Sequence, residues 1–235
     1  MPDDQAHAKT AAAHRGVERV RPGMRLALGT GSTAGLAVRA IAEKFPGVAF
    51  DCVSSSRETE ELARSLGIPV RPLRADDRFD LMLDGADEVT PSLDLTKGGG
   101  GALLREKLLA ELSTEVVILV DPTKRVRHLG QRVPIPVEVV PFARSVVARQ
   151  LANDGFRVRH REGTNGRPYL TDNGNEILDL VPLRPVEDPA ATAAALLAPT
   201  GVVEVGIFVG LASVVLVGHP DGRVEELPRG RPAPP

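Results

Sequence analysis

Short apolar runs alternate with helix-patterned segments over the first half of the chain, and this alternation limits the possible folds most strongly. Four runs have the length and composition of buried strands: MRLALG at 24–29, VAFDCV at 48–53, FDLMLD at 79–84 and EVVILVD at 115–121. Segments with helical spacing lie at 5–20, 32–45, 56–67 and 102–113. Strands that alternate with helices of ~10–15 residues form βαβ units and a parallel sheet. We therefore predict an α/β fold, a Rossmann-like and mostly parallel sheet flanked by helices.

The pattern changes near Gln131, where a second and smaller domain is expected. Strands and helices are predicted at 133–140, 141–155, 156–181, 188–197 and 201–206, with Asn and Gly turns between the short strands. This order predicts an α+β domain on an antiparallel sheet. The apolar run ASVVLVG at 212–218 has the composition of a buried strand that returns to the first sheet.

These patterns predict where the chain divides. The Rossmann-like catalytic domain is expected at 1–130 plus 206–227, and the small α+β domain at 131–205. Residues 228–235 are rich in Pro and Arg and offer almost no apolar surface to bury, so they are expected to be a disordered tail.

Composition argues against several classes of function. The chain has 235 residues, a formal net charge of −2 and a pI near 6.2, whereas a nucleic-acid-binding surface would be basic. Aromatic residues make up only 3%, too few for a base-stacking surface. No run approaches the ~18 apolar residues of a membrane helix, and the N-terminal segment lacks the apolar core of a secretory signal. A single cysteine, Cys52, fits a reducing compartment and a buried structural thiol, so a cytoplasmic protein is expected.

The first glycine turn, GTGSTA at 29–34, permits three interpretations. Its spacing matches a dinucleotide-binding turn, and Asp51 lies 22 residues after Gly29. In such a site, however, the acid stands at the C-terminal end of the second strand, and Asp51 is expected inside its strand. A turn that merely begins a helix, without any ligand, is the third interpretation.

The remaining interpretation, binding of a single phosphate, is favoured by the hydroxyl groups of the turn. Thr30, Ser32 and Thr33 are donors, and the free N–H groups of a helix start point toward the same place. Three hydroxyls at such a turn suit a compact phosphomonoester better than a pyrophosphate. We therefore expect a monophosphate site and no bound NAD.

A second candidate site follows the strand at 79–84. The strand delivers Asp84 to its C-terminal end, the side on which open α/β sheets bind ligands. Gly85 allows a sharp turn there, and Asp87 and Glu88 follow in the loop. For any one of these acids alone, a solvated loop is the simpler interpretation.

Lys97, four glycines and Glu106 then follow within ten residues of one another. Consecutive glycines permit backbone N–H groups to approach an anionic or hydroxylated ligand, and Lys97 adds a positive charge. A carboxylate on a helix, such as Glu106, can be held rigidly. A flexible hinge beside a salt bridge is the structural alternative.

Five motifs together resemble ribose-5-phosphate isomerase of the A type: GTGSTA, DGADEV, KGGGGALLREK, PVEVVPFA and LTDNGNEILDL. The resemblance runs in order from about Lys9 to Gly222, nearly the whole chain. The resemblance implies an aldose–ketose isomerase, an intramolecular oxidoreductase of the non-oxidative pentose phosphate pathway. It would interconvert ribose 5-phosphate and ribulose 5-phosphate through an enediolate, without metal or organic cofactor. It also implies a homodimer or homotetramer.

The resemblance also implies roles for individual residues. Glu106 would transfer the proton, Asp84 and Asp87 would bind the sugar, and Lys97 would stabilise the negative oxygen. Asp84 is the more suited of the two to ring opening. The substrate-binding positions would be Lys9, Thr30, Gly31, Ser32, Thr33, Gly85, Ala86, Gly98, Gly99, Gly100 and Lys124. Pro122 and Ser213 depart from the family's pattern, which leaves the placement of Lys124 open and implies an altered hydrogen bond at Ser213.

Two rival functions remain. An amino-sugar-phosphate deaminase would share the fold type, but the DGADE and KGGGGALLREK motifs argue against it. A sugar-phosphate sensor of the transcription-regulator type would need a DNA-binding helix-turn-helix, and only ~20 residues precede the first strand. The five histidines show no metal-ligand spacing, so no metal is expected. A group of second-domain arginines suggests a solvated surface or subunit contact: Arg144, Arg149, Arg157, Arg159 and Arg161.

Overall fold

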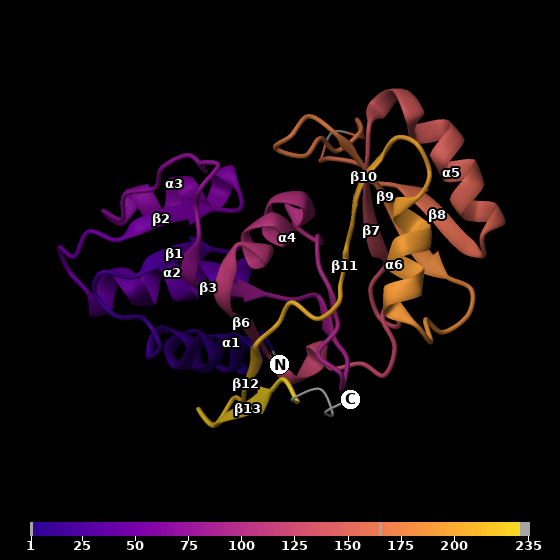
Figure 1. The fold of residues 1–235 in the computed structure, drawn as a ribbon. Helices are drawn as coiled ribbons and strands as arrows, with labels where there is room; N and C mark the ends of the chain where they lie inside the picture. Colours follow the sequence, from indigo (N-terminus) through magenta and orange to yellow (C-terminus); the bar gives the residue numbers. More distant parts are fainter. Residues whose placement is uncertain (1, 165, 231–235) are drawn as a thin grey trace, which may run out of the picture. The chain divides into compact units, whose positions relative to one another are not determined.

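The computed structural model describes residues 2–164 and 166–230, and Figure 1 shows its helices and strands. The chain divides into two compact units. Unit 1 consists of Met1–Gly85, Leu109–Lys124 and Gly210–Pro235, and unit 2 of Ala86–Leu108 and Arg125–Val209. Each unit has its own sheet and its own hydrophobic core, and each is described by itself.

Unit 1 contains a six-stranded sheet in the order β13-β12-β6-β3-β1-β2. Its strands are β1 (Arg25–Leu28), β2 (Asp51–Ser54), β3 (Phe79–Gly85), β6 (Ser113–Val120), β12 (Val214–Gly218) and β13 (Val224–Pro228). All pairs are parallel except β12 with β13. Strands buried on both faces give near-continuous apolar runs, which is why four of them were readable from sequence. The Rossmann-like prediction is confirmed, including the return of 212–218 to the first sheet.

Three helices complete unit 1: α1 (Pro2–Val17), α2 (Ser32–Lys44) and α3 (Arg57–Ser65). The helix α1 lies directly on β12. Gly218 of β12 is so close to this helix that a Cβ at position 218 would stand only 2.0 Å from the Ala8 carbonyl oxygen. The core beneath α1 and α2 includes Leu26, Ile41 and Leu119, all about 1% exposed or less. The predicted strand 48–53 begins only at Asp51, so this acid starts the strand instead of lying within it.

Unit 2 is built on a four-stranded antiparallel sheet in the order β10-β7-β9-β8. The strands are β7 (Ile135–Val139), β8 (Phe156–His160), β9 (Glu176–Pro182) and β10 (Val202–Val205), and the helices are α5 (Arg144–Asn153) and α6 (Pro189–Leu197). Apolar side chains from α5 and α6 pack on one face of this sheet, with Val137, Leu151 and Leu180 fully buried. The other face carries acids, and it is the face that matters for the candidate site.

The observed division differs from the predicted boundaries. The prediction assigned 86–108, 125–130 and 206–209 to the Rossmann-like domain, whereas the structure groups all three with unit 2. The reason is a small sheet in the order β11-β5-β4, formed by β4 (Glu88–Val89), β5 (Leu95–Thr96) and β11 (Ile207–Phe208). Strands of two residues leave no periodic signal in a sequence. The helix α4 (Leu103–Glu111) runs across the division.

The prediction placed the start of the disordered tail too early, at residue 228. β13 continues to Pro228, which pairs with Val214 on β12. Arg229 donates its backbone N–H to the Ser213 carbonyl at 3.0 Å, and its side chain donates to the Gly210 carbonyl. Residues 231–235 lie outside the described residues.

A chain that ends at Gly230 should keep its full stability, whereas one that ends at Leu227 should lose about 1–3 kcal/mol. The shorter chain lacks the two hydrogen bonds of Arg229, and each such bond contributes about 0.5–1.5 kcal/mol. Urea unfolding of the two truncated chains and the full chain measures the difference. Equal midpoints for all three chains would show that residues 228–230 do not stabilise the sheet edge.

Cys52 lies in β2 and is 1% exposed. Burial raises the pKa of the Cys52 thiol to about 12, and the neighbouring Asp51 adds to the effect. The thiolate is the reactive form, so the native protein should not react with a thiol reagent at pH 8 but should react fully in denaturant. Absorbance of the released chromophore follows this reaction. Rapid labelling of the native protein would contradict the structural role.

No described helix combines the length and the apolar character needed to cross a membrane.

Candidate active site

The glycine turn after β1 is shaped by contact with the end of β3. Gly29 donates its backbone N–H to the Leu83 carbonyl at 2.9 Å. A Cβ at position 29 would stand 2.1 Å from Oδ1 of Asp84, so only glycine fits there. Asp84 Oδ1 accepts the backbone N–H groups of Thr30 at 3.1 Å and Gly85 at 2.8 Å. The turn therefore fixes this fully buried carboxylate.

The start of α2 has the features of an anion-binding site. Gly31 precedes the helix with φ +98° and has no side chain with which to cap it. The first N–H groups of the helix thus face outward together with the positive end of the helix dipole. Ser32 Oγ accepts a hydrogen bond from Lys9 Nζ at 3.2 Å, which brings an ammonium group to the same place.

The other two hydroxyl residues of the turn are buried. Thr30 Oγ1 lies 2.6 Å from Ser55 Oγ, and Thr33 is 8% exposed in the first turn of α2. Ser55 Oγ donates to the Leu28 carbonyl, and Thr59 Oγ1 donates to the Gly29 carbonyl at 2.9 Å. Through these hydrogen bonds the segment after β2 holds the glycine turn in place. Of the three hydroxyl residues of the turn, Ser32 is the exposed one.

Lys124 lies at the same edge of the sheet. It ends the 3-10 turn η1 (Pro122–Lys124), which follows β6, and β6 runs parallel to β3. Gln5 Nε2 donates to Asp121 Oδ2 at 3.1 Å, which holds the N-terminal part of α1 at this edge. Lys9 is one helical turn further along α1. The two lysines and the start of α2 thus belong to one end of the unit 1 sheet.

The two departures from the family's pattern have local structural roles. Pro122 opens η1, where its fixed φ suits the start of a helical turn. Ser213 Oγ accepts the backbone N–H of Val116 at 3.0 Å, and the Ser213 N–H donates to the Val116 carbonyl at 2.9 Å. Both departures are compatible with the sheet and with η1.

The second group of candidate residues belongs to unit 2 and centres on a buried ion pair. Lys97 Nζ lies 3.1 Å from Glu106 Oε1, and these residues are 3% and 4% exposed. Lys97 Nζ also lies 5.8 Å from the centre of the Phe208 ring. The backbone is fixed as well, since Lys97 donates its N–H to the Gly206 carbonyl at 2.9 Å. A carboxylate held this way is suited to accept and return a proton.

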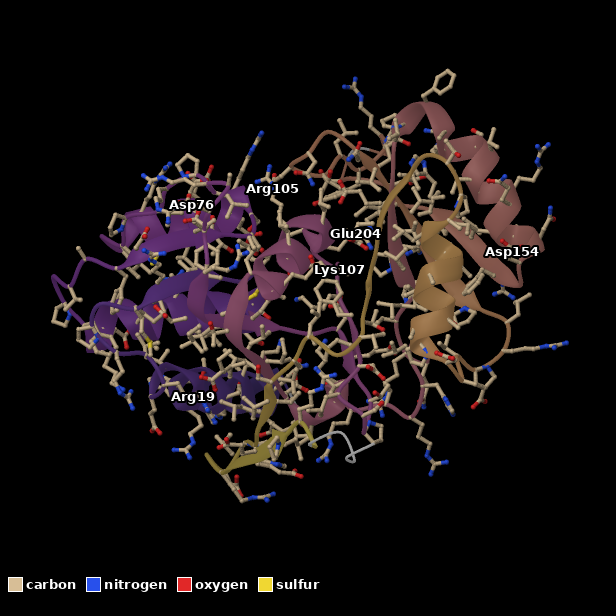
Figure 2. The ribbon with its side chains drawn as sticks, in the orientation of Figure 1. Arg19, Asp76, Arg105, Lys107, Asp154 and Glu204 are labelled. Carbon is tan, nitrogen blue, oxygen red and sulfur yellow. The ribbon has the colours of Figure 1, made fainter. Side chains whose placement is uncertain are left out.

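The residues beside Glu106 anchor α4 to unit 2. Arg105 donates to Asn173 Oδ1 at 2.8 Å, and Lys107 donates to Glu204 Oε1 at 2.5 Å and to the Val205 carbonyl at 2.7 Å. Lys107 and Glu204 face each other in Figure 2. The residues on either side of Glu106 thus hold α4 in place, which limits the movement of the Glu106 side chain.

The PVEVVPFA and LTDNGN motifs meet in one network. Glu138 on β7 is fully buried, and its Oε1 accepts hydrogen bonds from the side chains of Thr171, Asn173 and Asn175 at 2.9–3.1 Å. The same Asn173 holds Arg105 beside Glu106. Both motifs therefore support the candidate catalytic helix.

The glycine segment after Lys97 is closely enclosed. A Cβ at Gly99 would stand 2.7 Å from Asp87 Oδ1, and one at Gly101 would stand 2.3 Å from the Tyr169 hydroxyl. Gly101 also has φ +80°, a conformation that favours glycine. The segment is thus a tightly packed loop, not the flexible hinge of the structural alternative.

The remaining acids of the DGADE motif divide into two roles. Asp87 Oδ2 accepts the Gly99 N–H at 2.7 Å, so this half-buried acid shapes the glycine segment. Glu88 is fully buried and accepts the Thr96 hydroxyl and the N–H groups of Gly130, Arg132 and Val133. Glu88 is therefore structural, although sequence reasoning expected it in an open loop.

Gly85 and Ala86 stand where β3 ends. Gly85 is the last residue of the strand, and its backbone does not adopt a positive φ. The sharp turn expected there is absent, and the strand simply continues to the boundary of unit 1. Gly85 and Ala86 are both half-buried.

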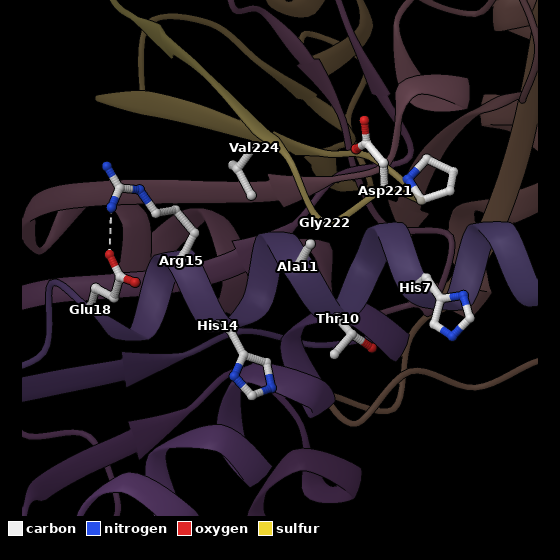
Figure 3. A pocket seen from close by; sticks show the side chains of 10 residues that line it. His7, Thr10, Ala11, His14, Arg15, Glu18, Asp221, Gly222 and Val224 are labelled. Carbon is white, nitrogen blue, oxygen red and sulfur yellow. Dashed lines mark hydrogen bonds and ion pairs between the residues drawn. The ribbon is translucent and has the colours of Figure 1, made fainter.

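A surface groove of about 780 Å³ in unit 1 is lined by none of the candidate residues. It runs between α1 and the β12–β13 turn and is lined by His7, His14, Asp221 and their neighbours. In Figure 3 the two imidazole rings point to one side of α1 and Asp221 lies on the other. Because its polar groups do not converge, the groove lacks the features of a binding site.

Fold and site together define a Rossmann-like α/β protein with an anion-binding turn and a buried carboxylate–lysine pair. The family model for ribose 5-phosphate isomerase A (phosphoriboisomerase A) matches residues 51–222. The chain belongs to this family. The ribose-5-phosphate isomerase A of Chloroflexus aurantiacus is 48% identical over 217 residues, which cover 91% of this chain and 90% of the relative.

Solved structures agree with the family assignment. Ribose 5-phosphate isomerase A from Methanocaldococcus jannaschii has a TM-score of 0.87 at 38% identity and covers 94% of this chain and 97% of its own. A D-ribose-5-phosphate isomerase in complex with phospho-erythronic acid has a TM-score of 0.91 at 35% identity, over 96% of this chain and all (100%) of that one.

Proposed function

We propose that this chain interconverts D-ribose 5-phosphate and D-ribulose 5-phosphate, with Glu106 as the base that transfers the proton. The observation that carries the proposal is the buried Glu106–Lys97 pair, 3.1 Å apart, in a chain of this family. The ligand of a structural relative, phospho-erythronic acid, supports a sugar phosphate as substrate.

In the proposed reaction Glu106 removes the proton from C2 of the open-chain aldose. The electrons of the broken C2–H bond form the C1–C2 double bond of an enediolate, and the C1 oxygen takes up the negative charge. Lys97 and the backbone N–H groups of Gly98 and Gly100 stabilise that charge, because positioned donors act strongly in a water-poor site. Glu106 then returns the proton to C1.

Asp84 serves the proton transfers between oxygens. It assists the ring opening that exposes the aldehyde, and it moves a hydroxyl proton from O2 to O1 during isomerisation. Its two backbone hydrogen bonds keep the carboxylate in one orientation. Asp87 binds sugar hydroxyls through the carboxylate that also holds Gly99.

The phosphate is assigned to unit 1. The start of α2, Ser32 and Lys9 form the main part of this site, and Lys124 contributes from the same edge of the sheet. Thr30 and Thr33 line the turn. Binding a remote phosphate helps to position the reacting carbons.

Three further properties belong to the proposal. The enzyme acts without metal or organic cofactor, because the base and the donors are side chains and backbone groups of the chain itself. It is a homodimer or homotetramer, supported by the exposed apolar side chains of Phe142 and Val146, which are 99% and 53% exposed. A cytoplasmic location fits the single free cysteine.

The test is an assay of the purified full chain with ribose 5-phosphate in the presence of EDTA, with ketose formation followed by absorbance. We expect turnover that EDTA does not reduce. Glucosamine 6-phosphate serves as the competing substrate, and release of ammonia from it without ketopentose formation would instead favour a deaminase. Binding of ribose 5-phosphate without turnover would favour a sensor.

A further inference from the structure

The carbonyl groups of the glycine segment have specific partners in unit 2. Arg161 Nη1 donates to the Gly98 carbonyl at 2.9 Å and to the Gly99 carbonyl at 3.1 Å. The Tyr169 hydroxyl donates to the Gly100 carbonyl at 3.0 Å. Three consecutive carbonyls therefore point toward the segment between β8 and β9, which carries Arg161 and Tyr169.

Arg161 is itself firmly held. Its Nε and Nη2 donate to the two carboxylate oxygens of Asp179, with Nε 3.1 Å from Oδ2. The side chains of Arg161 and Asp179 are only 15% and 4% exposed. The backbone N–H of Arg161 bonds the Ile177 carbonyl at 2.9 Å, and its guanidinium lies 5.8 Å from the centre of the Tyr169 ring. A bidentate pair of this kind restricts the guanidinium to one geometry.

The orientation of the carbonyls determines the orientation of the N–H groups. In a planar trans peptide the C=O and the N–H point in opposite directions. The Gly98 carbonyl points to Arg161, and the N–H of the same peptide unit, on Gly99, points away from it to Asp87 Oδ2 at 2.7 Å. The Gly99 carbonyl also points to Arg161, so the Gly100 N–H is likewise turned away.

We infer that Arg161 is a positioning residue for the isomerisation. Held by Asp179, it orients the peptide units between Gly98 and Gly100. The Gly99 N–H is thereby directed to Asp87, and the Gly100 N–H is turned away from Arg161 to act as an oxyanion donor beside Lys97. The inference rests on the proposed function, since it specifies which residue prepares the donors of that site. Arg161 itself does not touch the substrate.

The chain supplies a matched control in Arg159, two residues earlier on β8. Arg159 Nη2 lies 3.7 Å from Oδ2 of the same Asp179, but its side chain is 77% exposed. Replacing either arginine removes one positive charge near Asp179. Of the two, Arg161 is the one seen to bond the glycine carbonyls.

The experiment compares Arg161→Ala, Arg161→Lys, Tyr169→Phe and Arg159→Ala in the full chain. Steady-state kinetics with ribose 5-phosphate give kcat and KM, and calorimetry gives the affinity for phospho-erythronic acid. The carboxylate of this acid spreads a negative charge over two oxygens and so resembles the enediolate, whose charge is shared by O1 and O2. Thermal unfolding of each variant and binding of inorganic phosphate report on the fold and on the phosphate site.

We expect Arg161→Ala to lower kcat about tenfold to hundredfold, as small misplacements of catalytic groups do, with KM changed less than about threefold. Its affinity for phospho-erythronic acid should fall by a similar factor, whereas inorganic phosphate should bind as in the wild type. Added guanidinium ion should restore part of the activity. Tyr169→Phe should show a smaller loss of the same kind, and Arg159→Ala should remain within about twofold of the wild type.

A folded Arg161→Ala variant with unchanged kcat would overturn the inference. A loss of kcat in Arg159→Ala as large as that in Arg161→Ala would overturn it too. If Arg161→Ala does not fold, the kcat values of Arg161→Lys and Tyr169→Phe provide the test. Wild-type kcat in both of these variants would also overturn the inference. An inactive wild-type chain would instead refute the proposed function, so the two failures are distinguishable.

Discussion

Glu106→Gln should lower kcat about 10²–10⁴-fold, because a positioned general base contributes about that factor. Gln is nearly isosteric with Glu and can still accept a hydrogen bond from Lys97, so α4 and its anchors should persist. It cannot accept the C2 proton. Each tenfold loss corresponds to about 1.4 kcal/mol, so the barrier should rise by roughly 3–5 kcal/mol. The proposed phosphate site consists of unit 1 residues and does not include Glu106, so KM should change far less than kcat.

Glu111→Gln is the matched control, because Glu111 lies on the same helix and is exposed. It should retain wild-type kinetics. Steady-state assays of both variants, with circular dichroism to confirm the fold, make the comparison. A Glu106→Gln enzyme with more than about a tenth of the wild-type kcat would contradict the assignment of the base, since even the lower limit is a larger effect.

Free ribose should be a far poorer substrate than ribose 5-phosphate. In the proposed site the phosphate accepts charge-assisted hydrogen bonds from Lys9 and from the start of α2, and each would contribute about 1.5–3 kcal/mol. Loss of two such contacts should lower kcat/KM roughly 10²–10⁴-fold. Part of the loss should appear in kcat, because remote binding energy also positions the reacting carbons.

The comparison uses both sugars with the wild type and with Lys9→Ala. Lys9→Ala should reduce kcat/KM for ribose 5-phosphate and leave the activity on ribose unchanged. Similar kcat/KM values for the two sugars in the wild type would contradict the phosphate site. An equal loss for both sugars in Lys9→Ala would show that Lys9 acts on something other than the phosphate.

The parallel sheet could be predicted because its strands are buried on both faces and interrupted by glycine turns. Ser32 at the start of α2 and Asp84 at the end of β3 follow from local rules for helix starts and strand ends. Lys97 and Glu106 were recognised as site residues from their motif, although their ion pair was not predicted. These features depend on residues close together in sequence, which is why sequence reasoning reached them.

The remaining features depend on contacts between distant segments. Arg161 lies 62 or more residues from the glycine carbonyls that it bonds, and its sequence context resembles a solvated surface. Glu88 bonds N–H groups 42–45 residues further along. Ser55 and Thr59 support the glycine turn, yet their sequence showed only a helix start. For Ser55 and Thr59 the only signal in the sequence was a polar residue beside a recognisable motif.

The account rests on transfer of a proton through an enediolate, and exchange with solvent tests this claim most directly. The wild-type chain is incubated with ribose 5-phosphate and EDTA in D₂O until the two sugars reach equilibrium, and proton NMR follows C1 of the ketose. The protonated Glu106 carboxyl exchanges with solvent while the enediolate is bound, so over many turnovers we predict ribulose 5-phosphate that carries deuterium at C1. Ketose formed over many turnovers without deuterium at C1 would indicate hydride transfer, and it would contradict the role of Glu106.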